Sequence, residues 1–255
     1  MSIWAILQAR SSSSRLPGKV LKPLLGEPML ARQIERILRC RRLDGLLIAT
    51  SDASDDDAIA ALAARLQLPC FRGSLNDVLS RYAQAAAGVD AEHIVRLTGD
   101  CPLTDPAIID AVIDQHLREG NDYTSNCAPA TLPDGLDVEV VRKAVLLAAD
   151  AQAIKPSERE HVTLYVRNHG EQFKLGNYHH QPDLSGLRWT VDEPEDFAFV
   201  SAVYAALYSQ RPGFTTADIL ALLQQQPQLA AINHRLERNE GLLRSLQHDK
   251  ELGYE

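Results

Sequence analysis

Three cations and a run of serines directly follow the first apolar segment of the sequence. Residues 8–19 read QARSSSSRLPGK, and the cations are Arg10, Arg15 and Lys19. Two guanidinium groups can each fork onto phosphate oxygens, the lysine adds a point charge, and serine hydroxyls and backbone N–H groups can complete an anion site. The Pro-Gly pair predicts a tight turn that brings Lys19 back toward the strand end. We interpret the loop as a phosphate-binding site. The alternative is a flexible serine-rich surface loop.

The loop differs from two widespread nucleotide-binding motifs. It contains neither the GxxxxGK[ST] pattern of a P-loop nor the GxGxxG pattern of a dinucleotide-binding fold. Because we interpret the loop as a phosphate-binding site, we count Gln8, Ala9 and Ser11, together with the three cations, as candidate nucleotide-binding residues.

Two aspartates follow apolar segments in the same local pattern. Asp100 lies in LTGDCPL and Asp192 in VDEP, and each precedes a proline by two residues. Proteins bind Mg²⁺ through one or two carboxylates together with phosphate oxygens and water. We predict that Asp100 and Asp192 bind one Mg²⁺, which would offset charge on the phosphates. The alternative is two unrelated turn or cap residues.

Two further polar segments could contact an acceptor molecule. The segment DGLDVE contains Asp134, Asp137 and Glu139, and the last two would share one face of a strand. In SEREHVT, Arg159 could pair with a substrate carboxylate and His161 could touch the acceptor. The polar face of an edge strand and a capped helix start would explain the same residues.

These candidates lie near the ends of alternating strands and helices. Apolar periodicity predicts strands at 3–9, 45–50, 68–72 and 93–98, and helices at 28–40, 75–87 and from the acidic run 51–57 to 66. Such alternation is typical of βαβ units, with a mainly parallel sheet between two layers of helices. Ligands of these sheets bind at the carboxyl ends of the strands. We therefore predict a three-layer α/β fold with its site at that edge.

The second half of the chain is less regular. We predict strands at 122–127, 135–141, 173–179 and 187–191, and helices at 141–153, 158–169 and 194–208. The segment after residue 215 is polar and helical in pattern. We divide the chain into a main domain, 1–209, and a C-terminal helical appendage, 210–255, which could serve in dimerisation or as a lid.

Composition narrows the class of protein. The formal net charge of −8 disfavours a general nucleic-acid binder, because such proteins need a net basic face. The four cysteines are far apart, so neither a zinc site nor a disulfide framework is indicated. The sequence shows neither a signal peptide nor an apolar run long enough to cross a bilayer. We expect a cytoplasmic protein that binds neither membrane nor nucleic acid.

Taken in order, five motifs resemble a family of enzymes. The sequence is similar to the cytidylyltransferases that activate 2-keto sugar acids, the CMP-deoxyoctulosonate and CMP-sialate synthetases. It looks closer still to their relatives, the spore-coat polysaccharide biosynthesis protein F family. The likeness spans about residues 3–208 and rests on LQAR at 7–10, GS at 73–74 with DVLSRY at 77–82, LTGDCPL at 97–103, PDGLDVE at 133–139 and REHVT at 159–163.

The resemblance implies a nucleotide-diphospho-sugar-transferase-like fold and transfer of CMP from CTP with loss of pyrophosphate. Arg10, Arg15 and Lys19 match the triphosphate-binding loop, and Asp100 and Asp192 match the two magnesium-binding aspartates. The resemblance also places base and sugar contacts at 73–82, so Gly73 and Arg81 join the nucleotide-binding candidates. Thr98 and Asp100 of the LTGDCPL motif are counted with them. Thr98 stands where the deoxyoctulosonate synthetases carry glutamine, and the acceptor therefore stays open between a keto sugar acid, another acidic sugar and a phosphonate. A homodimer is expected from the family.

The resemblance leads us to expect catalysis by Arg10, Lys19 and Asp100, mainly through positioning and electrostatics. A sugar-1-phosphate nucleotidyltransferase is the nearest rival, although its GxGxRxxPxT loop lacks a match here. A nucleotide-sugar-dependent glycosyltransferase would need the compact DxD metal motif, whereas we interpret the acidic run at 51–57 as helix-capping charge. A non-catalytic binding module has no reason to keep both the cations and the carboxylates.

Overall fold

One twisted sheet organises the residues that the computed structural model describes, which are 1–234, 238 and 240–254. Its strand order is β5-β4-β1-β6-β8-β7-β9. The strands are β1 (Ile3–Gln8), β4 (Gly45–Ser51), β5 (Cys70–Gly73), β6 (His93–Thr98), β7 (Tyr123–Ser125), β8 (Glu139–Arg142) and β9 (Leu175–Asn177).

The sheet is mainly parallel, as the sequence predicted. Strands β5, β4, β1 and β6 run parallel to one another, β8 is antiparallel to both β6 and β7, and β9 is parallel to β7. The register pairs Gln8 with Thr98, so the ends of β1 and β6 lie side by side. The loop that follows β1 and the turn that follows β6 therefore start from the same edge of the sheet.

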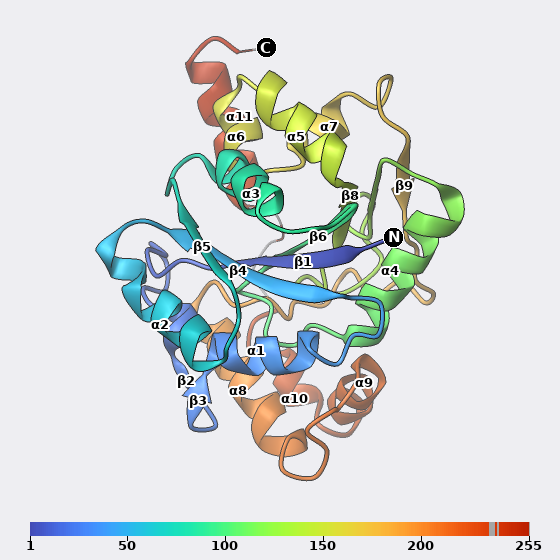
Figure 1. Ribbon diagram of the computed structural model, residues 1–255. Coiled ribbons are helices and arrows are strands. Elements are labelled where there is room, and N and C mark those ends of the chain that lie inside the picture. The colour runs from blue at the N-terminus through green and yellow to red at the C-terminus, as the bar shows by residue number, and fades with distance from the viewer. Residues whose placement is uncertain (235–237, 239, 255) are drawn as a thin grey trace.

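Helices cover both faces of the sheet (Figure 1). One layer contains α1 (Met29–Ile37), α2 (Asp57–Arg65), α4 (Pro106–Glu119), α8 (Pro194–Leu207), α9 (Thr216–Gln225) and α10 (Pro227–Ala230). The other contains α3 (Val78–Ala87), α5 (Lys143–Gln152), α6 (Pro156–Glu160), α7 (Leu164–Asn168) and α11 (Glu240–Glu251). Short 3-10 helices at η1 (Lys19–Leu21) and η2 (Ser54–Asp56) and a small hairpin of β2 (Pro23–Leu24) and β3 (Glu27–Pro28) complete the described elements.

Strand β1 shows why two layers are needed. Its side chains alternate between the two faces, as strand geometry requires. Ala5 and Leu7 lie in the apolar cluster under the α1, α4 and α8 layer, and Ile6 lies in the cluster under α3 and α5. None of these three side chains is exposed. A strand that is apolar on both faces would expose apolar surface to water unless helices covered both faces of the sheet.

Three sequence predictions of secondary structure were wrong in detail. The strand expected at 187–191 is not formed, and only an isolated bridge joins Asp134 to Arg188. The helix expected at 158–169 is two short helices, α6 and α7, because Val162 between them has a left-handed φ of 52°. The strand expected at 135–141 begins only at Glu139, since Gly135 turns the chain with a φ of 103°.

Helix α4 went unpredicted, although its sequence carries start and stop signals. The Asp105 side chain accepts a hydrogen bond of 3.0 Å from the N–H of Ala107, Pro106 occupies the first turn, and Gly120 ends the helix with a φ of 63°. These are the N-cap, first-turn proline and C-terminal glycine of a well-signalled helix.

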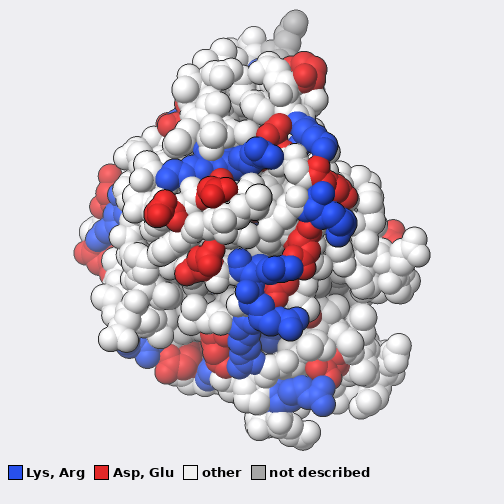
Figure 2. All heavy atoms as spheres, turned by 45° about the vertical axis from the view of Figure 1, so that its right-hand side comes forward, with Lys and Arg blue, Asp and Glu red and all other residues white. Residues whose placement is uncertain are grey.

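The predicted C-terminal helices are present, but they divide between the two layers. Phe214, Ile219 and Leu222 of the α9 region are buried in the core beside α8. Helix α11 instead lies on the opposite layer, next to α6 (Figure 1). Within the described ranges we find no helix with the length and apolarity needed to cross a membrane. Figure 2 shows a face on which basic and acidic side chains are interleaved.

Candidate functional site

The loop after β1 folds back as its Pro-Gly turn predicts. The N–H of Gly18 donates to the carbonyl of Ser11 at 2.9 Å, and Gly18 itself has a left-handed φ of 66°. This turn starts the short helix η1 at Lys19 and directs that side chain toward the sheet edge. Only 8% of Lys19 is exposed.

The Lys19 ammonium group lies between the two predicted metal-binding aspartates. Its Nζ is 3.3 Å from Asp100 and 2.8 Å from Asp192, and it also donates to the carbonyl of Val191 at 2.7 Å. Burial lowers the pKa of Lys19, but the two carboxylates outweigh burial and raise it. Burial likewise raises the pKa of Asp100, while Lys19 lowers it to a net value of about 2. Both groups therefore stay charged at neutral pH.

Asp192 is also bound by two arginines. It accepts from Arg15 at 3.0 Å and from Arg188 at 3.1 Å. Arg188 holds Asp134 at 2.9 Å and Asp196 at 3.0 Å as well, which ties the second aspartate segment to the DGLDVE segment. Sequence reasoning missed Arg188, because nothing local distinguishes an arginine that joins two distant turns.

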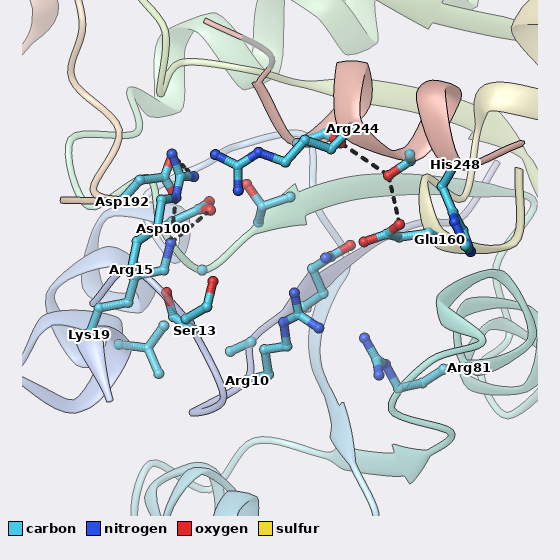
Figure 3. A pocket seen from close by; sticks show the side chains of 18 residues that line it. Arg10, Ser13, Arg15, Lys19, Arg81, Asp100, Glu160, Asp192, Arg244 and His248 are labelled. Atoms are coloured by element: carbon cyan, nitrogen blue, oxygen red, sulfur yellow. Dashed lines mark hydrogen bonds and ion pairs between the residues drawn. The ribbon is translucent and has the colours of Figure 1, made fainter. Parts of the chain in front are cut away.

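Most predicted nucleotide-binding residues line one cavity of about 450 Å³ (Figure 3). It is bounded by the end of β1, the following loop, the end of β6 and Arg81 of α3. The lining includes Gln8, Ala9, Arg10, Arg15, Lys19, Arg81, Thr98, Asp100 and Asp192. Within the described residues Arg10 is exposed and makes neither an ion pair nor a hydrogen bond, which leaves its guanidinium group available to an anion.

Two of the nucleotide-binding candidates lie behind this lining. The N–H of Ser11 donates to Asp56 at 2.7 Å, so Ser11 anchors the loop to the turn before α2. Gly73 packs under Arg81: a Cβ at this position would lie 2.9 Å from the Phe71 ring and 3.2 Å from Arg81. Both residues support the side chains that face the cavity.

A second cavity, of about 340 Å³, adjoins the first and holds most of the predicted acceptor-binding residues. The two share Arg10, Asp100 and Asp192 among their linings. The second cavity is polar and mixed in charge, with Arg96, Asp134, Asp137, Glu139, His161, Arg167 and Arg188 among its lining residues.

Two acidic residues of this second cavity have opposite electrostatic environments. Burial raises the pKa of Asp137 to about 7, although Arg238 binds its carboxylate and opposes that shift. Burial also raises the pKa of Glu139, but Arg96, which binds it directly, prevails and lowers it. Tyr123 donates a further hydrogen bond of 2.6 Å to Glu139. Glu139 is thus a fixed negative charge, and Asp137 can exchange a proton near neutral pH.

Arg159, a predicted acceptor-binding residue, is bound by two aspartates outside both cavities. It forms a two-point ion pair with Asp77, through Nε at 2.9 Å and a terminal nitrogen at 2.7 Å, and also contacts Asp150 at 2.7 Å. It is absent from the linings of both cavities. The pair joins α6 to the start of α3, which carries Arg81.

This chain is similar in sequence to a known family of enzymes. A family model described as "Cytidylyltransferase" matches residues 4–226. Over 233 residues the chain is 35% identical to the spore coat polysaccharide biosynthesis protein SpsF of Bacillus subtilis, with 88% of this chain and 95% of SpsF covered.

Two solved structures have the same fold. A cytidylyltransferase from Leptospira borgpetersenii is 31% identical, with a TM-score of 0.86 over 90% of this chain and 97% of that one. A CMP:2-keto-3-deoxy-manno-octonic acid synthetase, solved in complex with CTP, is 19% identical, with a TM-score of 0.61 over 81% of this chain and 99% of the other. At that identity the second likeness concerns the fold alone.

Proposed function

This chain belongs to the cytidylyltransferase family, and from that membership we propose that it transfers CMP from CTP to an acidic sugar or a similar acceptor, with release of pyrophosphate. The observation that carries the proposal is the pair of adjoining cavities, which meet at Arg10, Asp100 and Asp192. One cavity is lined by cations suited to phosphates and the other by mixed charges suited to a polar acceptor. A group could pass between two substrates at that junction.

The nucleotide would bind in the first cavity. Arg10 is free to form a two-point contact with phosphate oxygens, and Lys19 supplies a charge that its carboxylates hold in place. An acceptor oxygen would attack the α-phosphorus in line while the bond to the pyrophosphate oxygen breaks. Fixed cations at this point stabilise the charge that develops on the leaving pyrophosphate.

Asp100 and Asp192 are the residues that would hold Mg²⁺. Carboxylate oxygens are the protein ligands that this ion prefers, and both aspartates face the cavity that would contain the phosphates. Groups of three or more acidic, histidine or cysteine side chains able to hold a metal are not found in the described part of the chain. Substrate phosphates and water would therefore have to complete the ligand set, and bound Mg²⁺ would offset negative charge on the triphosphate.

The second cavity suits an acceptor that carries both hydroxyls and a carboxylate. Arg96 and Arg188 already bind internal acids, whereas Arg167 has no hydrogen bond or ion pair from its side chain to another described residue. This guanidinium group, in the same cavity lining as Asp137 and His161, could bind an acidic sugar. The name of the Bacillus subtilis relative is consistent with an acceptor from surface polysaccharide biosynthesis. The expected homodimer and the cytoplasmic location stay predictions.

The test is pyrophosphate release. The purified protein is incubated with Mg²⁺, each of the four ribonucleoside triphosphates in turn and a panel of acidic sugars and sugar 1-phosphates, with neutral sugars as controls. We expect release with CTP and an acidic sugar, and release that stops when Mg²⁺ is chelated. Release with UTP or GTP and a sugar 1-phosphate, but not with CTP, would overturn the proposal.

A further inference from the structure

Helix α11 forms one wall of the nucleotide cavity. It begins at Glu240, beyond residue 226, where the match to the family model ends. Nevertheless Gly241, Arg244, Ser245 and His248 line the cavity together with the loop after β1. Figure 3 shows the helix crossing over the cavity, with Arg244 pointing toward Arg15 and Asp192. The site is thus assembled from the two ends of the chain.

Side-chain contacts hold α11 in this place. At its far end Asp249, which is 4% exposed, accepts from the N–H of Ser157 at 3.0 Å and also binds the Ser157 hydroxyl. In the middle of the helix, Ser245 donates to Glu160 at 2.7 Å and lies 2.9 Å from Nε2 of His161. These contacts fix the helix to α6 and the turn after it, and so they set where the backbone of Arg244 lies.

A single carboxylate oxygen joins α11 to the phosphate loop. Oε2 of Glu240 is 3.1 Å from a terminal nitrogen of Arg15 and 3.2 Å from a terminal nitrogen of Arg244. Two guanidinium groups would otherwise repel each other at such a short separation. Glu240 therefore places Arg244 beside Arg15 as part of one cationic group.

Acidic side chains already pair with two of the three loop cations, so a bound triphosphate would need a further cation. Arg15 already contacts three carboxylates, those of Asp192, Glu193 and Glu240, and Lys19 contacts two. Much of the positive charge predicted from the sequence is thus offset by acids within the site. A triphosphate carries several negative charges, and Arg10 alone among the loop cations is without a carboxylate partner in the described residues. Arg244 is two-thirds exposed and contacts a single carboxylate, so it can turn to a ligand.

We propose that Arg244 is a phosphate-binding residue of this site, directed at the pyrophosphate part of the nucleotide, and that Glu240 positions it beside Arg15. This inference rests on the proposed function for the identity of the nucleotide. Arg244 lies at the end of the cavity that contains Lys19, Asp100 and Asp192, away from Arg81 (Figure 3). Phosphates bound by Lys19 would therefore come within its reach.

The test is calorimetric titration of the full-length protein with CTP, CMP and pyrophosphate in the presence of Mg²⁺. We compare the wild type with Arg244→Ala, Arg244→Lys and, as a matched control, Lys250→Ala, which removes an exposed cation from the same helix outside the cavity. Arg244→Ala should weaken CTP and pyrophosphate about tenfold or more, because it removes a hydrogen bond between two charged groups. It should change CMP binding by less than about twofold. Arg244→Lys should recover part of the loss, and Lys250→Ala should match the wild type.

Two results would overturn the inference. One is that Arg244→Ala binds CTP and pyrophosphate as tightly as Lys250→Ala does. The other is an equal loss for CTP and CMP with unchanged pyrophosphate binding, which would place Arg244 on the nucleoside instead. If the wild type binds no CTP, the proposed function fails, and the pyrophosphate titrations still decide the role of Arg244.

Discussion

Nζ of Lys19 lies 2.8 Å from a carboxylate oxygen of Asp192, across 173 residues of sequence. Lys19 begins η1, after the loop that follows β1, and Asp192 precedes α8. The same ammonium group contacts Asp100 after β6 at 3.3 Å. Three segments that are far apart in the sequence thus meet at the Lys19 ammonium group. This group lines the cavity in which we propose that phosphates bind.

Lys19→Met should reduce pyrophosphate release by about a hundredfold, the usual cost of removing one electrostatic contact to a transition state. It should also lower the melting temperature by several degrees, because the aspartates lose a buried partner. Lys19→Arg should melt closer to the wild type. Pyrophosphate release is measured by a coupled assay and the melting temperature by thermal unfolding, both on one preparation of each variant. Unchanged turnover in Lys19→Met would show that this ammonium group is purely structural.

Asp100→Asn and Asp192→Asn test the proposed metal site. Each should lower Mg²⁺-dependent turnover by about a hundredfold or more, because a neutral amide is a poor ligand for this ion. The measurement is a Mg²⁺ titration of pyrophosphate release at saturating CTP. Asp55→Asn, an exposed acid before α2 and outside both cavities, serves as the control. If both variants keep the wild-type response to Mg²⁺, these two aspartates do not bind it.

Asp137 should make the fold less stable as the pH rises. Its pKa is about 7 in the folded chain, above the ordinary value of 3.8, so its contribution is fully present below about pH 4 and is lost as the pH rises through 7. Asp137→Asn cannot ionise and should escape that loss. The melting temperature of the variant minus that of the wild type should therefore be more positive at pH 8 than at pH 5. A difference that is constant or reversed would contradict the raised pKa.

A double-mutant cycle separates two roles for Arg159. If the residue acts by pairing with Asp77, then Arg159→Ala, Asp77→Ala and the double variant should show a coupling of about 1 kcal/mol in the free energy of unfolding, as expected for a partly exposed two-point ion pair. Chemical denaturation provides the measurement. A direct role in binding the acceptor would instead appear as a raised acceptor KM in Arg159→Ala that Asp77→Ala does not share.

Gly135→Ala should be strongly destabilising. Gly135 has a φ of 103°, and an added Cβ would lie 2.4 Å from the backbone nitrogen of Thr190, which cannot move aside without disturbing the segment before Asp192. We expect a loss of about 3 kcal/mol or more. Gly120→Ala is a suitable control, because Gly120 also has a left-handed φ, of 63°, but has open space around its Cβ position. Equal melting temperatures for the two variants would mean that the close approach costs nothing.

Local patterns in the sequence determined the first half of the fold and the main elements of the site. The buried strands β1, β4 and β6 and the turn at Gly18 depend on apolar runs and on residues with special backbone preferences, which act over a few positions. The loop after β1 and the two aspartates, which the structure brings together at one cavity, could be selected from the sequence for the same reason, and their phosphate-binding and metal-binding roles stay predictions. The segment 187–191 could not be assigned correctly, because its single bridge to Asp134 depends on a partner more than fifty residues away.

Tertiary structure decided which of these charges meet. Lys19 contacts both Asp100 and Asp192, and Arg159 pairs with Asp77. Arg244 of the last described helix lines the same cavity as the loop after β1. All of these contacts join segments that are far apart in the chain. The sign and spacing of charges along a sequence do not encode such pairings. They form when packing of the two helical layers brings the loop and α11 over the same edge of the sheet. Burial then strengthens the contacts of Lys19 by excluding water, whereas Arg244 stays largely exposed.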